Sequence, residues 1–400
     1  MEESRPVTTR RTTVRLIYHH RTRATDAQRI HIREMIQAFR GLGHEVEEVA
    51  LVDTETAVDD AARDAGDALW KRLAKRVPFA YDCLQLLYNF MGIPLLAAKL
   101  VGRKVDLIYE RYSLFNFTGV AAARLFRVPI VLEVNSPFAL EQKRDRHIRT
   151  FRFAQWTERV ICNSATLVVA VSGPLRQILV DAGVAPSKIV LMPNGVNLEH
   201  FQTRADSDAL RSSLGLKDKV VIGFIGWFRD WHGLDILLQA FHQSDAMRER
   251  AALLLIGDGP AMPQLRQYVQ DNCLQASVIF TGPVPHHKVP PYLDLMDIAV
   301  QPAANEYCCP MKIIEYMALA KPIVAPRQDN VKELLTGGAE ALLFTPRDAA
   351  SMAQALAELV NDANRRAAMG ASARAAIDRR GFTWSHNAQR VLELVRRTSA

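Results

Sequence analysis

Short runs of apolar residues alternate, along most of the chain, with stretches whose apolar positions recur every three or four residues. Apolar runs bounded by turn residues predict buried strands, and the three-to-four spacing predicts helices. Strands that alternate with helices are typical of parallel βαβ units. In the first half, the predicted strands span residues 14–18, 44–52, 106–110, 129–133, 167–171 and 189–192, with a helix over 26–42.

The pattern pauses at a turn over residues 193–195 and a polar, aperiodic stretch over 197–219. A second series follows, with strands at 220–225, 253–256, 278–281, 298–301, 323–325 and 341–344, and helices at 234–242, 311–318 and 384–397. We therefore predict an α/β protein of two Rossmann-like parallel-sheet domains that face each other across a cleft. Ligands of such sheets lie at the carboxyl ends of the strands.

The pause also sets the predicted domain boundaries. Residues 1–196 form an N-terminal domain, 197–218 a linker and 219–381 a C-terminal domain, while 382–400 form a helix that returns to the N-terminal domain. A length of 400 residues agrees with two domains.

The net charge of +7 lies mainly in the first half of the chain. A basic surface suits nucleotide phosphates or anionic lipid, and no recognition motif accompanies the charge, so we expect no nucleic-acid partner. Five cysteines without CxxC spacing argue against a disulfide framework or a zinc site and fit a reducing cytoplasm.

The sequence predicts a cytoplasmic protein that can lie peripherally on the inner face of the cell membrane. Residues 1–13 are polar and lack the apolar core of a signal peptide, and no uncharged apolar run reaches the ~18 residues of a membrane span. Residues 70–105 are basic and apolar. They either pack as two helices broken at Pro78 and Pro94, or touch an anionic membrane through the basic flank 71–76.

Residues 226–233 follow the first predicted strand of the second half and precede a helix, so their N–H groups can face an anion. Gly226, Arg229 and His232 in this loop suit a diphosphate, although an ordinary turn with a solvated arginine has the same composition. Gly257 and Gly259 end another strand, where glycine allows either close approach of a ligand or a tight structural turn.

Residues 306–326 carry the clearest chemical signal of the second half. Lys312 falls in the first turn of a predicted helix, where a cation is unfavourable unless an anion lies nearby. Glu315, three residues on, shares its face and can accept the hydroxyls of a ribose. A surface Lys–Glu pair is the alternative. Met311, beside Lys312, is placed in the same donor-binding set.

Basic residues also follow strands of the first half. His19, His20 and Arg21 open a predicted loop, and Arg111 lies just past a strand end. These side chains can bind a phosphate or an anionic acceptor, or they can be solvated loop cations.

Eight segments in a fixed order carry a family resemblance. They are GHEV from Gly43, DLIYERYSL from Asp106, PIVLEVNSP from Pro129, VVAVSGPLRQIL from Val168, IVLMPNGVNLEHF from Ile189, GFIGWFRDWHGLDILLQAF from Gly223, LLLIGDGP from Leu253, and CCPMKIIEYMALAKPIVAP from Cys308. The chain resembles the retaining glycosyltransferases of family 4, which have the GT-B fold. The resemblance implies a UDP- or GDP-type sugar donor in the C-terminal domain and a glycan or lipid-linked acceptor at the N-terminal domain. It also implies no metal or other cofactor, and a role in cell-surface or exopolysaccharide synthesis.

The chain departs from the family pattern around the donor. The family has two glutamates eight positions apart, of which Glu315 matches the second, whereas the first falls on Tyr307 with Glu306 beside it. Trp227 and His232 stand where the family commonly has arginine and lysine.

On the acceptor side, Glu133 and Asn135 end a strand where many members carry a histidine, and strand alternation puts both on one side. Carried over, the resemblance assigns catalysis to Glu133, Asn135, Arg229, Lys312 and Glu306. Two other functions stay open: a nucleotide-sugar-binding protein without transferase activity, and a GT-B-type nucleotide-sugar epimerase.

Overall fold

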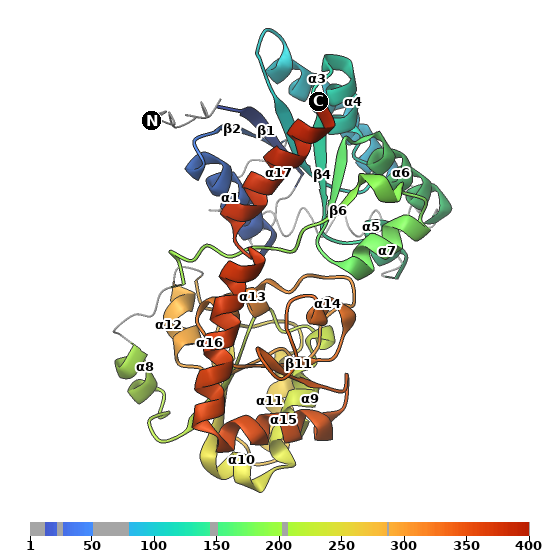
Figure 1. Ribbon diagram of the computed structural model, residues 1–400. Helices are drawn as coiled ribbons and strands as arrows, with labels where there is room; N and C mark the ends of the chain where they lie inside the picture. The colour runs from blue at the N-terminus through green and yellow to red at the C-terminus, as the bar shows by residue number, and fades with distance from the viewer. Residues whose placement is uncertain are drawn as a thin grey trace, which may run out of the picture. The chain divides into compact units, whose positions relative to one another are not determined.

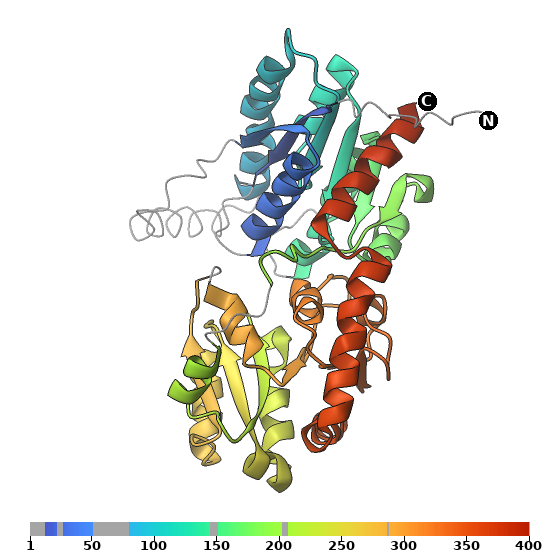
Figure 2. The same ribbon diagram turned by 60° about the vertical axis from the view of Figure 1, so that its left-hand side comes forward.

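The computed structural model describes residues 13–21, 27–50, 80–144, 151–201, 207–285 and 288–399 (Figure 1). The chain divides into two compact units. The first comprises Met1–Ala170, Ile178–Val190 and Ala388–Ala400, and the second Val171–Gln177 and Leu191–Asn387. Helices cover both faces of the sheet in each unit (Figure 1 and Figure 2).

The first unit is built on six parallel strands in the order β2-β1-β3-β4-β5-β6. Its strands are β1 (Arg15–His20), β2 (Glu45–Ala50), β3 (Leu107–Arg111), β4 (Ile130–Val134), β5 (Leu167–Ala170) and β6 (Ile189–Leu191). The helices of this part of the chain are α1 (Ala27–Gly41), α3 (Ala80–Leu100), α4 (Thr118–Phe126), α5 (Phe138–Arg144), α6 (Phe151–Ser164), α7 (Gly173–Asp181) and η1 (Pro186–Lys188). Strands β3, β4 and β5 are buried along their whole length. This burial explains the wholly apolar β5, whereas β3 and β4 also bury Glu110, Arg111 and Glu133.

The second unit has six parallel strands in the order β12-β11-β10-β7-β8-β9. They are β7 (Val220–Ile225), β8 (Ala251–Ile256), β9 (Val278–Gly282), β10 (Ile298–Val300), β11 (Ile323–Pro326) and β12 (Ala341–Phe344). The helices that follow β6 in the chain are α8 (Ser207–Ser213), η2 (Asp230–His232), α9 (Leu234–His242), α10 (Asp245–Arg250), α11 (Met262–Asp271), α12 (Val289–Asp294), α13 (Met311–Ala318), α14 (Asp329–Lys332), α15 (Ala349–Asn361), α16 (Ala363–Arg380) and α17 (Trp384–Ser399). Helix α17 belongs to the first unit from Ala388 onward. The predicted pair of Rossmann-like parallel sheets is confirmed.

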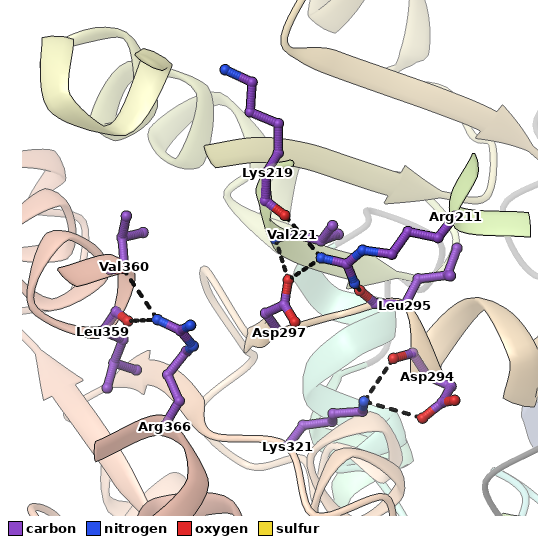
Figure 3. A network of polar contacts seen from close by, with 10 residues as sticks. All are labelled: Arg211, Lys219, Val221, Asp294, Leu295, Asp297, Lys321, Leu359, Val360 and Arg366. Carbon is purple, nitrogen blue, oxygen red and sulfur yellow. Dashed lines mark hydrogen bonds and ion pairs between the residues drawn. The ribbon is translucent and has the colours of Figure 1, made fainter. Parts of the chain in front are cut away.

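Part of the predicted linker 197–218 packs on the second unit. Arg211 of α8 donates to the carboxylate of Asp297 at 2.7 Å and to the carbonyl oxygens of Lys219 and Leu295 (Figure 3). Asp297 also accepts the N–H of Val221, at the start of β7, at 2.8 Å. The second unit therefore includes α8, and its sheet begins from an anchored segment.

Helix α3 overturns one expectation. Its single span, Ala80–Leu100, contains Pro94, where we expected a break. A proline inside a helix removes one backbone hydrogen bond, and tertiary packing can outweigh that cost. Here α3 packs along α4, with Gly92 so close to Thr118 that an added Cβ would lie 2.5 Å from its hydroxyl oxygen. The basic flank 71–76 lies outside the described residues. No helix in the described parts of the chain is long and apolar enough to cross a membrane.

Candidate functional site

The order of the second sheet locates the best candidate site. Strands β8 and β9 extend from one side of β7, and β10, β11 and β12 from the other. The connections therefore reverse direction between β7 and β10, and open parallel sheets bind ligands at the carboxyl ends of such a pair. The loop 226–233 follows β7, and the loop 301–310 leads from β10 into α13.

Three residues predicted from the sequence meet at this point. The ammonium nitrogen Nζ of Lys312 lies 3.3 Å from Nε2 of His232 and 4.4 Å from the centre of the Phe224 ring. A Cβ added to Gly226 would lie 3.0 Å from the same nitrogen, and the φ of Gly226 is +150°. A side chain at position 226 would therefore occupy the space beside Lys312.

The two direct contacts of the Lys312 ammonium, the His232 ring and the Phe224 ring, carry no negative charge. Burial lowers the pKa of Lys312 to about 8, and the nearby Cys308 and Glu315 only partly offset that effect. Burial and the charge of Lys312 lower the pKa of His232 to about 2, so this imidazole is neutral near pH 7. Its Nε2 atom can therefore accept a hydrogen bond from the ammonium.

The other predicted donor-side residues lie at varied depths around this pair. Arg229 and Glu306 are exposed, and Met311 and Glu315 are half-buried at the start of α13. Glu315 is one turn after Lys312, as the spacing predicted. Whether any of these side chains contacts a donor stays a prediction.

Gly257 and Gly259 serve a structural purpose that the sequence left open. An added Cβ would lie 2.0 Å from the carbonyl oxygen of Gly226 at the first position, and 2.5 Å from backbone atoms of Phe228 at the second. Both glycines have positive φ, +128° and +155°. The close approach is therefore made by the protein's own loop 226–233, which these glycines allow to pack against β8.

Charged residues at the carboxyl ends of β3 and β4 in the first unit form a buried cluster. Arg111 lies 3.0 Å from the carboxylate of Glu133, and Asn135 donates a hydrogen bond to the same carboxylate oxygen. The structure thus brings together three residues that the sequence assigned to the acceptor side. Glu133 is only 2% exposed, and its carboxylate is bonded to neighbouring side chains of the protein.

Two further members of this cluster, Tyr109 and His31, were not predicted from the sequence. Tyr109 donates to the second oxygen of Glu133 at 2.7 Å, and Nδ1 of His31 lies 2.7 Å from Arg111. Burial alone would raise the pKa of Glu133, but His31, Arg111 and the hydrogen bonds hold it below its ordinary value. Burial lowers the pKa of His31 to about 4. The available signal was a histidine on the buried face of the helix α1.

His19 and His20 correct the predicted loop, because β1 continues through both. Both are buried: His19 bonds to the Glu110 carboxylate, and His20 lies 2.9 Å from the Glu48 carboxylate. The neighbouring strands β3 and β2 supply those carboxylates, so the strand can continue through polar residues without leaving them unpaired. Arg21 follows the strand and is half-buried.

The side chain of Arg21 is also held by the protein. It donates to the side-chain oxygen of Gln85 at 2.7 Å and lies 3.6 Å over the Tyr88 ring. Within the described residues, no group of three His, Cys, Asp or Glu side chains could hold a metal ion.

Comparison with known proteins places the chain in a family. The pattern described as Glycosyl transferases group 1 matches residues 219–362, and the pattern of Glycosyltransferase Family 4 matches residues 28–200. The chain belongs to this family of glycosyltransferases, and the resemblance drawn from its eight segments is confirmed. The Glycosyltransferase Family 4 match includes the strands β2 to β6, and the Glycosyl transferases group 1 match includes the strands β7 to β12.

Curated relatives are similar over most of their length. The alpha-D-kanosaminyltransferase of Streptomyces kanamyceticus is 25% identical over 279 residues, which cover 68% of this chain and 72% of that protein. The D-inositol 3-phosphate glycosyltransferase of Stackebrandtia nassauensis is 29% identical over 304 residues, covering 72% and 67%. These similarities support a glycosyltransferase as the class of enzyme.

Solved structures share the fold. HepE of Anabaena, crystallised with UDP, superposes with a TM-score of 0.70 at 19% identity, covering 95% of this chain and 99% of that one. Sucrose-phosphate synthase of Thermosynechococcus elongatus gives a TM-score of 0.71 at 17% identity, covering 96% and 98%. The protein is thus a GT-B glycosyltransferase in fold and family.

Proposed function

We propose that the protein transfers a sugar, with retention of configuration, from a UDP- or GDP-sugar to a glycan or lipid-linked acceptor. The second unit holds the donor at Lys312, and the first unit serves the acceptor. The observation that carries this proposal is the Lys312 ammonium at the carboxyl ends of β7 and β10, beside Gly226 and a neutral His232. A half-buried cation whose direct contacts, His232 and Phe224, are uncharged is suited to an anionic ligand.

The chemistry follows from the charge on the leaving group. The acceptor oxygen bonds to the anomeric carbon, the bond from that carbon to the phosphate oxygen breaks, and the acceptor proton passes to a phosphate oxygen. Lys312 stabilises the charge that develops on the diphosphate, and fixed donors of this kind commonly supply the largest catalytic effect. No metal ion and no separate general base is required in this proposal.

The relatives support the donor class. HepE of Anabaena was crystallised with UDP and with UDP-glucose, and it shares this fold. The alpha-D-kanosaminyltransferase is by its name a sugar transferase.

A second candidate is a nucleotide-sugar-binding protein that does not transfer. It is favoured by one observation: the residue at the family's first glutamate position is Tyr307, and the neighbouring Glu306 is exposed on the loop before α13. If Glu306 does not reach the sugar, the donor would bind and stay intact.

One experiment separates these functions. A thermal-shift panel of UDP- and GDP-sugars identifies the donor, since a ligand at 100 times its Kd stabilises a protein by about 2.7 kcal/mol. The donor is then incubated with membrane glycolipid extracts, and the product is analysed by NMR. A new glycoside with the donor's anomeric configuration supports retaining transfer. An intact donor supports the binding protein, and an epimerised donor supports an epimerase.

The acceptor is proposed to be membrane-associated, on the basis of the basic flank 71–76 and the positive charge of the first half. Each surface cation adds about 1 kcal/mol of attraction to anionic lipid, so binding should be weak and salt-sensitive. The protein should sediment with anionic vesicles but not with neutral ones. A variant with Lys71, Arg72, Lys75 and Arg76 changed to Ser should stay in solution. Equal sedimentation of the two proteins would favour a soluble acceptor.

A further inference from the structure

The loop that joins β10 to α13 is held by its carbonyl oxygens. Side chains of the second unit donate to six of the seven carbonyls of residues 303–309, and they come from widely separated places in the sequence. The contacts are Gln301 to Ala303, Gln328 to Ala304 at 3.1 Å, Asn330 to Asn305 at 2.9 Å and to Cys308 at 2.8 Å, Ser172 to Tyr307 at 2.6 Å, and Asn194 to Cys309 at 2.9 Å. Asn330 alone binds two carbonyls, at either end of a turn.

Four of these side chains form what we call the amide cluster: Asn194, Gln301, Gln328 and Asn330. Gln328 is half-buried and the other three are buried. Each uses its NH2 group on the loop, while its own side-chain oxygen is buried without a protein partner among the described residues. An unpaired buried oxygen costs stability. In return, the NH2 groups bond to carbonyl oxygens of the loop, so the effect of the cluster is to hold those carbonyls in fixed positions.

The cluster fixes the direction of the loop's N–H groups. In a planar trans peptide, the carbonyl of one residue and the N–H of the next point in opposite directions. Carbonyls of residues 303, 304, 305 and 308 that face the cluster therefore turn the N–H groups of Ala304, Asn305, Glu306 and Cys309 away from it. Within the described residues, none of these four N–H groups donates a hydrogen bond to a protein atom.

We propose that the amide cluster orients the loop 303–309 as a preorganised row of backbone N–H donors for the phosphate–sugar part of the donor, and that Asn330 is its main positioning residue. The loop runs directly into Pro310 and α13, which carries Lys312. Successive N–H groups beside a cation form an anion site that needs no reorganisation when the ligand arrives. This inference rests on the proposed function for its ligand, but the orientation of the loop can be tested without a ligand.

The test compares two isosteric substitutions. Asn330→Asp replaces the NH2 donor by an oxygen that faces two carbonyl oxygens, so the loop has to move. Asn272→Asp is the matched control, because Asn272 also donates to one backbone carbonyl of the second unit, that of Tyr268 at 2.8 Å, from the end of α11. Hydrogen exchange of residues 303–311 in the free proteins, and donor Kd, KM and kcat, are measured for both variants and the wild type.

Asn330→Asp should accelerate exchange of the Cys308 N–H, which donates to the Asn305 carbonyl at 3.2 Å across the turn that Asn330 holds. It should also raise the donor Kd about tenfold, the factor of one lost hydrogen bond, and lower kcat. Asn272→Asp should match the wild type in all of these. A Gln328→Glu variant should show the same changes as Asn330→Asp to a smaller extent. Unchanged exchange in a folded Asn330→Asp protein would overturn the inference. Altered exchange without any donor binding by the wild type would instead overturn the proposed function.

Discussion

The charged residues near the carboxyl ends of the strands have different contacts in the two units. In the first unit, Arg111 and Glu133 are buried together, and His19 is bonded to Glu110. In the second unit, the Lys312 ammonium faces a neutral imidazole and an aromatic ring. The first sheet therefore pairs its buried charges with each other, whereas the direct contacts of Lys312 with His232 and Phe224 are uncharged, with Glu315 one turn away on α13. A charge paired within its own fold serves stability first, whereas a cation whose direct contacts are uncharged is available to an anionic ligand.

The largest effect should follow from breaking the buried pair of the first unit. Arg111→Met leaves the Glu133 carboxylate buried without its cation, and removal of one partner of such a pair typically costs about 3–5 kcal/mol. Denaturant unfolding monitored separately for each unit should show the loss in the first unit. A loss below about 1 kcal/mol would mean that Arg111 does not stabilise the fold and is free to serve the acceptor.

Lys312 should make donor binding dependent on pH. The pKa of Lys312 in the free protein is about 8, and a bound diphosphate favours the ammonium and raises that pKa. Below pH 7 the lysine is already protonated, so affinity should be flat. Above pH 8 binding has to take up a proton, so the donor Kd should rise up to tenfold per pH unit, or about 1.4 kcal/mol. Calorimetry at pH 7, 8 and 9 measures this change.

The variant Lys312→Arg is the control for this pH dependence, since arginine keeps its charge throughout the range. Its donor affinity should be independent of pH between 7 and 9. The same alkaline weakening in Lys312→Arg would assign the titration to another group.

Glu315 should contribute to every ligand that carries a ribose. Glu315→Gln keeps one acceptor oxygen and loses the charge, so donor and free nucleoside diphosphate should both weaken by about 1 kcal/mol. Equal losses for the two ligands support a contact with the ribose. A loss of affinity for the nucleotide sugar but not for the free nucleoside diphosphate would mean that Glu315 contacts the sugar instead of the ribose.

The smallest effect should come from a partly exposed ion pair of the first unit. Lys99 lies 2.7 Å from Glu47, with both side chains more than a third exposed. Lys99→Met should cost less than about 1 kcal/mol, because water already screens such a pair. A cost as large as that of Arg111→Met would remove the distinction between buried and exposed pairs on which the comparison rests.

The sequence predicted the sheets well because most of the strands contain a short run of apolar residues. The strand over residues 220–225 and the helix over 234–242 have the bounds that the pattern indicated. The pattern failed where tertiary contacts decide the outcome. Helix α3 continues through Pro94 because it packs on α4, and β1 continues through His19 and His20 because adjacent strands supply partners.

The candidate site was predictable only in part. Lys312, His232 and Gly226 could be placed from a strand–loop–helix pattern, since parallel strands bring their carboxyl ends together. Asn194 and Asn330 could not, because they reach the loop 303–309 from segments more than twenty residues away in the sequence. Their amide side chains resemble ordinary polar loop residues until the fold places them against the loop's carbonyl oxygens.

Donor binding by Lys312→Ala tests the central claim most directly. Isothermal calorimetry of the identified nucleotide sugar would compare this variant with Lys332→Ala, a lysine of the same unit that pairs with Asp329 at the surface. Loss of a charge-assisted contact should weaken binding by about 1.5–3 kcal/mol in Lys312→Ala, while Lys332→Ala binds as the wild type does. Wild-type affinity in a folded Lys312→Ala protein would contradict the account.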